Sequence, residues 1–145
     1  MNEIRIHRRS EQPAYRVVGE TVTGIAEASR TGQGFSLFEV VTPAGGGAPV
    51  HKHPHMEAVY VLDGCLDLVT GEDRRRVEAG DFVLVPGDTP HAYHNPGDRP
   101  ARALELTTPG GVEAFFADLD RTFGDAPPEP AALMSLIARY GVSLA

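Results

Sequence analysis

The sequence predicts an all-β fold, a sandwich or barrel of short strands, followed by two helices. Apolar and β-branched residues come in short runs between residues 16 and 107, and glycine and proline separate these runs. No helical pattern alternates with them, as a parallel sheet with crossover helices would require. After Pro109 the apolar residues change to spacings of three and four, which are typical of helices. These observations together define the expected fold class.

Seven runs are expected to form strands, and their β-branched and apolar content is the reason for each. They cover residues 16–18, 21–25, 35–42, 58–62, 66–70, 82–85 and 101–107. Gly71, Glu72 and Asp73 are expected to form a hairpin loop. The neighbouring basic residues Arg74–Arg76 are interpreted as part of a solvated turn, because short charge runs seldom form recognition surfaces.

Two amphipathic helices are expected in the last part of the chain. The first carries Val112, Phe115, Phe116, Leu119 and Phe123 and stops at Gly124. The second carries Leu133, Leu136, Ile137 and Tyr140, stops at Gly141, and follows a stiff linker of prolines. We expect residues 1–109 to form the barrel and residues 110–145 to pack on it as an extension, within one domain.

Composition excludes several classes of partner. The chain has 13 basic and 20 acidic residues, a net charge of −7, which disfavours nucleic acid. No apolar run approaches the roughly 20 residues that a membrane-spanning helix needs. Cys65 is the single cysteine, so no disulfide forms within the chain and a reducing cytoplasm is expected. Its apolar neighbours predict a small buried strand residue rather than a nucleophile.

Histidines gather in two stretches of the sequence. His51 and His53 lie two residues apart, so on a strand they face the same side about 7 Å from each other. Glu57 would lie about 20 Å from His51 on a straight strand, so the chain must turn near Pro54 before Glu57 returns. His91 follows another strand and turn. Imidazole and carboxylate ligands from two hairpins suit one Zn, Fe, Mn, Ni or Cu ion.

These two stretches resemble the two signature motifs of the cupin superfamily. The first motif corresponds to Gly45, His51, His53, Glu57 and Gly64, and the second to Gly80, Pro86, Asp88, His91 and Asn95. Asp88 departs from the motif, which has glycine there, so the turn's glycine is expected at Gly87. The resemblance implies a double-stranded β-helix, or jelly-roll barrel. It also implies that His51, His53, Glu57 and His91 bind one divalent metal inside the barrel.

The fourth ligand is left open between two residues. His55 has the same strand parity as Glu57 and would replace it, supplement it or act as an acid or base. A carboxylate leaves a divalent site at net +1, whereas imidazoles alone leave it at +2, a stronger Lewis acid. By alternation, Val59, Val61 and Tyr93 are expected to line the cavity. His94 is expected to point away from the cavity, and His7 is expected to be solvated.

Three functions remain possible for an apolar cavity with a metal at its base. The chain resembles small bacterial cupins that act as zinc-dependent cyclases of aromatic polyketides in antibiotic biosynthesis, which makes zinc the first expected metal. It also resembles quercetinase-like dioxygenases that use Fe, Mn, Ni or Cu. A non-catalytic module that only binds or senses a ligand is the third, because fold alone does not choose among them. A homodimer is also expected, because cupins commonly pair and residues before Tyr15 have no evident core role.

Overall fold

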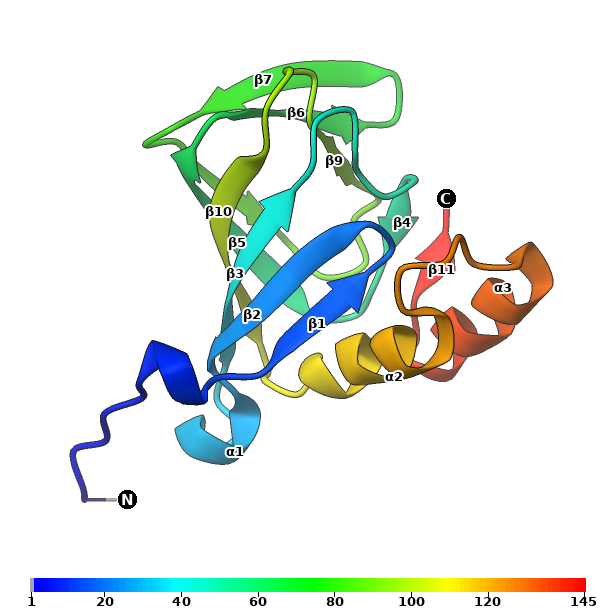
Figure 1. Cartoon of the computed structure of the whole chain (residues 1–145). Coiled ribbons are helices and arrows are strands. Elements are labelled where there is room, and N and C mark those ends of the chain that lie inside the picture. Colours follow the sequence, from blue (N-terminus) through cyan, green and yellow to red (C-terminus); the bar gives the residue numbers. More distant parts are fainter. Residues whose placement is uncertain (1) are drawn as a thin grey trace.

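The computed structural model describes residues 2–145 as a barrel built from two antiparallel sheets (Figure 1). In the larger sheet the strand order is β1 (Ala14–Val17), β2 (Glu20–Ala26), β3 (Ser36–Thr42), β10 (Ala101–Thr108), β5 (Met56–Asp63) and β8 (Phe82–Val85). The smaller sheet has the order β7 (Asp73–Glu78), β6 (Cys65–Thr70) and β9 (Ala92–His94). Strands far apart in sequence, β3, β10 and β5, lie side by side, so the barrel is closed by long-range pairing.

Two very short strands close the side of the barrel where the histidines lie. Strand β4 (His51–Lys52) pairs with β11 (Ser143–Leu144), and Leu144 lies opposite His51. The Ala145 N–H also donates to the Val50 carbonyl at 2.9 Å. The C-terminal end of the described chain therefore pairs directly with the strand that carries His51, and Figure 1 shows β11 beside β4.

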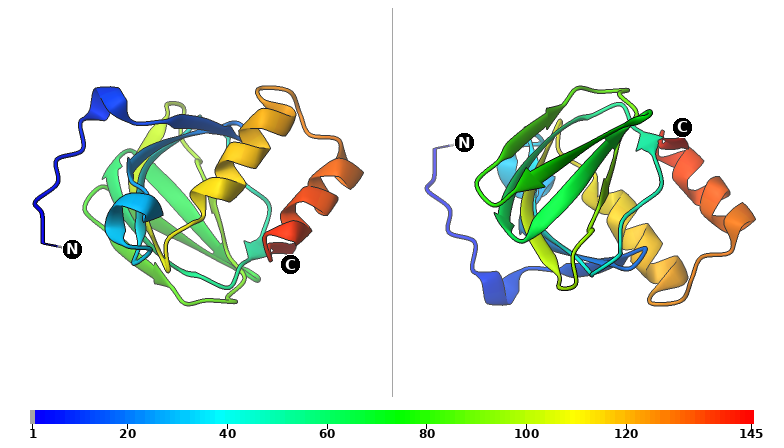
Figure 2. Two further views of the ribbon diagram at one scale, coloured as in Figure 1. Left: turned by 90° about the horizontal axis from the view of Figure 1, so that it is seen from below. Right: turned by 90° about the horizontal axis from the view of Figure 1, so that it is seen from above.

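Two helices lie along one side of the barrel (Figure 2). Helix α2 (Glu113–Phe123) packs against β1, and α3 (Pro130–Arg139) packs against α2 and β11. The Glu113 carboxylate fixes the start of α2, because it accepts hydrogen bonds from Ala28 N at 2.8 Å and Ser36 Oγ at 2.7 Å. None of the helices within residues 2–145 has the length and apolar character needed to cross a membrane.

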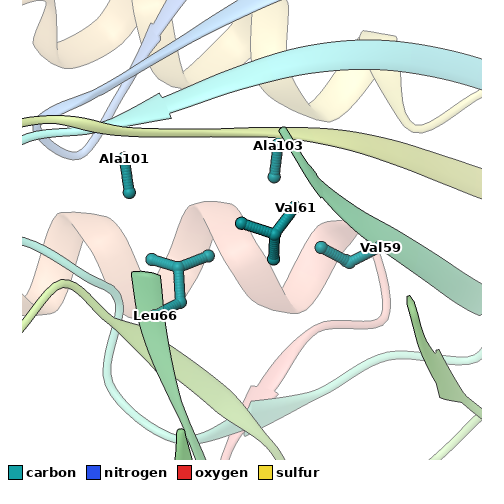
Figure 3. Close-up of a cluster of buried hydrophobic side chains, with 5 residues drawn as sticks. All are labelled: Val59, Val61, Leu66, Ala101 and Ala103. Carbon is teal, nitrogen blue, oxygen red and sulfur yellow. The ribbon is translucent and has the colours of Figure 1, made fainter. Parts of the chain in front are cut away.

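The apolar interior falls into two clusters. One contains Val59, Val61, Leu66, Ala101 and Ala103, which point toward one another from β5, β6 and β10 (Figure 3). The other joins the sheet to α2 and contains Val22, Phe38, Val40 and Phe116. The Phe38 and Phe116 rings meet edge to face at 5.2 Å, a favourable aromatic geometry. The alternation of buried residues along β3 and β5 produces both clusters.

The structure confirms the all-β class and both helices, and it corrects one turn. Every expected run overlaps a strand. The strands β4, β7, β9 and β11, the 3-10 helix Arg9–Glu11 and the helix α1 (Ala28–Thr31) were not expected. Asp73 is not in the hairpin loop: it begins β7 and pairs with Thr70. Arg74–Arg76 therefore lie on a strand rather than in a turn. Arg76 Nε donates to Asp67 Oδ1 at 2.6 Å because the two residues are opposite each other across β6 and β7.

Two smaller expectations are also corrected. His7 is not fully solvated: it is half-buried, and its Nδ1 lies 3.2 Å from the Ile25 carbonyl. Cys65 is half-buried at the start of β6 rather than buried, because it is the first residue after the Gly64 turn. Ile4 and Ile6, in the segment before β1, are 97% and 67% exposed. The expected homodimer concerns a second copy of the chain and stays a prediction.

Candidate metal centre

Backbone hydrogen bonds hold the two histidine hairpins together. His51 N donates to the His91 carbonyl at 3.0 Å, and His91 N donates back to the His51 carbonyl at 2.9 Å. Asp88 N donates to the His53 carbonyl at 2.7 Å. The three histidines are thus placed by main-chain contacts between segments about 40 residues apart, and their side chains need no further adjustment to face one another.

The turn before His91 explains how the chain tolerates Asp88. Asp88 has a φ of +58°, a left-handed conformation that aspartate adopts more readily than most residues. Gly87 is needed for a different reason: a Cβ there would lie 2.2 Å from the Pro54 carbonyl oxygen. Close approach of the two hairpins therefore requires Gly87, whereas the backbone turn itself is made by Asp88.

Three imidazoles converge on one point. One ring nitrogen from each of His51, His53 and His91 lies within 4.8 Å of the others. Each Nδ1 lies in hydrogen-bonding distance of a backbone carbonyl: Pro49 for His51 at 2.9 Å, His55 for His53 at 3.0 Å, and Thr89 for His91 at 2.8 Å. A carbonyl only accepts, so each Nδ1 carries the hydrogen and each Nε2 offers a lone pair.

Burial keeps the imidazoles of His51 and His53 neutral. Loss of water lowers the pKa of His53 to about 3 and also lowers the pKa of His51. His53 and His91 are 6% and 1% exposed. Neutral imidazole is the form that binds metals, and three such donors with fixed tautomers suit a divalent ion of the Zn, Fe, Mn, Ni or Cu group. The described residues therefore fit a divalent metal ion.

Glu57 lies beside the three imidazoles but outside their mutually close set. Its Oε2 is 2.8 Å from His91 Nε2 and 3.9 Å from His53 Nε2. Burial raises the pKa of this carboxyl. The Nε2 of His91 holds a lone pair, so the short contact is a hydrogen bond when the Glu57 carboxyl carries the proton. Its role as fourth ligand stays a prediction, and its position also suits a group that carries a proton.

His55 stacks on His53 instead of joining the three converging nitrogens. The two rings are 3.8 Å apart and within 3° of parallel. Burial lowers the pKa of His55 to about 4, so its ring is neutral. His55 lines the cavity that adjoins the imidazoles. Its expected alternative role as a ligand stays a prediction, because the set of mutually close donor atoms contains His51, His53 and His91 and not His55.

The cavity has a volume of about 170 Å³ and lies inside the barrel. Val59 and Tyr93 line it, as expected, and the Tyr93 hydroxyl is buried without a hydrogen-bond partner in the described part of the chain. Val61 does not line it: this side chain is fully buried in the apolar cluster of Figure 3, one alternation further along β5. His94 points away from the cavity, but it is half-buried, and its Nε2 lies 3.1 Å from the Ala48 carbonyl.

Sequence reasoning missed two acidic residues and the C-terminal segment in this lining. Glu105 lies opposite Val59 on β10, and burial raises its pKa well above the ordinary value. Glu20 also lines the cavity, and its carboxylate accepts a 2.5 Å hydrogen bond from Thr42 Oγ1. Strand alternation would have revealed Glu105, because Ala101, Ala103 and Thr107 share its inward parity. Leu144 reaches the cavity only through the pairing of β11 with β4.

The fold and the site together define a cupin-type barrel with a three-histidine centre suited to a divalent ion. Residues 38–107 match the family model "Cupin_2: Cupin domain". The chain belongs to the cupin superfamily.

Three curated proteins are similar to the chain in sequence, and two of them carry a functional name. The chain is 31% identical over 130 residues to "Quercetin 2,3-dioxygenase" of Bacillus subtilis (strain 168), which covers 86% of this chain and 37% of that protein. It is 40% identical over 72 residues to "Dimethylsulfoniopropionate lyase DddQ" of Ruegeria pomeroyi, which covers 49% of this chain and 35% of that protein. The chain therefore spans little more than a third of the length of either relative.

Solved structures share the fold at lower identity. The polyketide cyclase RemF from Streptomyces resistomycificus superposes with a TM-score of 0.64 at 22% identity, over 72% of this chain and 79% of that one. The ectoine synthase from P. lautus superposes with a TM-score of 0.68 at 18% identity, over 79% of this chain and 85% of that one. At these identities the similarity establishes the fold and says nothing about the reaction.

Proposed function

We propose that this chain is a metal-dependent enzyme that acts on a small molecule bound in the barrel cavity. The observation that carries the proposal is the hydrogen bonding of His51, His53 and His91. All three Nδ1 atoms face backbone carbonyls at 2.8 to 3.0 Å, which leaves three lone pairs directed to one place. A divalent ion held there would act as a Lewis acid toward a substrate oxygen.

The surrounding residues supply the other parts of such a reaction. Glu57 lies next to two of the imidazoles, and burial raises the pKa of its carboxyl, which suits a group that takes a proton and returns it. The unpaired Tyr93 hydroxyl is available to donate a hydrogen bond to a bound oxygen atom. Val22, Val40 and Leu66 form apolar walls that exclude water and strengthen these polar contacts.

The finer reaction that we propose is ring closure of an aromatic polyketide. Glu57 lies outside the mutually close set of donors, so three neutral imidazoles would leave a divalent site at net +2, the stronger Lewis acid. In its ionised form Glu57 would take the proton from the carbon that attacks a substrate carbonyl and return it to the oxygen of that carbonyl. The reaction is redox-neutral and needs no oxidant, which makes zinc the metal that we propose.

A second candidate is a quercetinase-like dioxygenase. The observation that favours it is the 31% identity to the Bacillus subtilis quercetin 2,3-dioxygenase, which extends over 86% of this chain. This reaction would require dioxygen as co-substrate and Fe, Mn, Ni or Cu at the histidines. The same residues would serve it, with Glu57 as base.

Metal analysis combined with two activity measurements tests the proposal. We expect zinc to dominate in untagged protein, cyclisation of a linear aromatic polyketide precursor by mass spectrometry, and no oxygen uptake with quercetin. Oxygen uptake together with Fe, Mn, Ni or Cu would identify the dioxygenase instead. Unchanged activity after chelator treatment would contradict both reactions, and turnover of neither substrate by metal-loaded protein would indicate a binding module.

A further inference from the structure

A second hollow lies directly outside the metal cavity. This outer cleft has a volume of about 310 Å³ and is bounded by the end of β10, the start of α2 and the segment after α3. Four residues line both the outer cleft and the metal cavity: His55, Val112, Phe115 and Val142. These four residues border both hollows, and His55 is the one polar residue among them.

The residues that border both hollows and those of the outer cleft present flat, fixed ring surfaces. His55 is held by stacking on His53 at 3.8 Å, and the rings of Phe115 and Tyr140 lie 5.2 Å apart. The Tyr140 hydroxyl donates to Asp118 Oδ2 at 2.7 Å, which ties the end of α3 to α2. The Glu113 contacts described above tie α2 to the barrel. The cleft is therefore largely formed before a ligand arrives, which favours a planar ligand.

The charges around the two hollows exclude one class of ligand. Within the described chain, no lysine or arginine lines either hollow. The metal cavity carries Glu20, Glu57 and Glu105 instead. A carboxylate or phosphate on the distal part of a ligand would lose its water without gaining a positive partner. A ligand that fits both hollows is therefore uncharged beyond the oxygen atoms at the histidines.

We propose that the metal cavity and the outer cleft form one elongated binding site for an uncharged aromatic ligand of more than one ring. The oxygen-bearing ring lies at the histidines, and a second ring lies in the outer cleft against Phe115 and Tyr140. His55 is the positioning residue between them. At about 170 Å³ the metal cavity is smaller than the roughly 300–1,000 Å³ of typical ligand sites, so a larger ligand needs the cleft.

This inference rests on the proposed function, because the inner half of the site requires the metal. Its test compares two uncharged probes with adjacent oxygen atoms: catechol, which has one ring, and 3-hydroxyflavone, whose oxygen-bearing bicyclic ring system carries a distal phenyl ring. Affinities are measured by calorimetry on metal-loaded full-length protein. We expect 3-hydroxyflavone to bind the unmodified protein at least about tenfold more tightly than catechol, because it gains aromatic contacts in the cleft.

Single substitutions test which residues provide the additional affinity for 3-hydroxyflavone. We expect His55→Ala and Phe115→Ala to weaken 3-hydroxyflavone about three- to tenfold and to change catechol less than about twofold. His55→Phe keeps a flat ring and should restore the affinity for 3-hydroxyflavone, whereas Val142→Trp should fill the cleft and weaken this probe alone. The matched control is His7→Ala, a half-buried histidine that lines neither hollow. Metal content and the circular dichroism spectrum confirm that each variant is folded.

The outcomes separate the two proposals. Metal-dependent binding of catechol with no preference for 3-hydroxyflavone would overturn the elongated site and leave the metal site intact. Equal weakening of both probes by His55→Ala would also overturn the positioning role. If neither probe binds metal-loaded protein, the proposed function and this inference both fail.

Discussion

The two parts of the barrel interior are built on different principles. Around the histidines, the strands are only two or three residues long, and the side chains are held by hydrogen bonds to backbone carbonyls from neighbouring turns. In the apolar clusters, seven- and eight-residue strands hold Val61 and Phe38 by close packing alone. Strand β5 passes through both parts, carrying Glu57 toward the site and Val61 into the core. Function and stability are therefore separable by mutation along one strand.

Removal of one imidazole should give the largest effect. We expect His91→Ala to reduce the affinity for zinc by at least about a thousandfold, since each ligand contributes a large share of binding free energy. The barrel should stay folded because its long ladders do not depend on His91. The measurement is competition with a chelator, followed by mass spectrometry of the bound metal. His94→Ala is the control, and it should retain the metal. Unchanged zinc affinity in His91→Ala would contradict the three-histidine centre.

Truncation of a core side chain should instead lower the stability and leave metal binding unchanged. Phe38 is fully buried and meets Phe116 edge to face, so Phe38→Ala should lower the free energy of unfolding by about 3–5 kcal/mol. Urea denaturation measures this change, and the folded fraction should bind metal normally. Phe82, which is 63% exposed on β8, supplies the control: Phe82→Ala should change stability by less than about 0.5 kcal/mol. Loss of metal in proportion to stability would show that the two parts are coupled.

The stability of the protein should depend on pH through the buried carboxyl of Glu20. Burial raises the pKa of Glu20 from 4.5 to about 7, so the folded protein holds this proton where the unfolded chain has released it. This contribution is complete below pH 4.5 and is lost as the pH rises to about 7. The stability of Glu20→Gln relative to the unmodified protein should therefore increase across that interval. Urea titrations at several pH values test it, with the exposed Glu72→Gln as control, and a difference independent of pH would contradict the shift.

The smallest effect should come from the outer hairpin. Arg76 pairs with Asp67 across β6 and β7, but its own side chain is 52% exposed, so water and salt weaken the pair. We expect Arg76→Ala to shift the unfolding midpoint less than any core substitution, and we expect the shift to shrink further in high salt. Thermal unfolding at low and high ionic strength provides the measurement. A shift as large as that of Phe38→Ala would show that this hairpin contributes to the core.

Local pattern predicted the longer elements except β7, and it predicted none of the very short ones. Runs such as 35–42 and 58–62 contain enough β-branched and apolar residues to predict strands. The helical spacing of Phe116 and Leu119 likewise predicts α2. Strands β4, β9 and β11 have two or three residues, too few for any periodicity. They exist because long-range pairing supplies their hydrogen bonds. Arg74–Arg76 were misplaced for a related reason: only the partner strand reveals Asp67 opposite Arg76.

The sequence by itself determined the all-β class, the two helices and the grouping of His51, His53 and His91, because spacing and turn residues act locally. Tertiary structure decided how the two histidine segments meet. The pairing of His51 with His91 and the separation of Glu57 from the shared point depend on where distant segments meet. The approach of Leu144 and Glu105 to the cavity has the same origin. The carbonyls that hold the imidazoles and the stacking of His55 on His53 are instead local contacts, between residues two positions apart. The pattern of residues along the sequence predicts which face of a strand a side chain occupies. The closure of the barrel decides which residues from other strands it contacts.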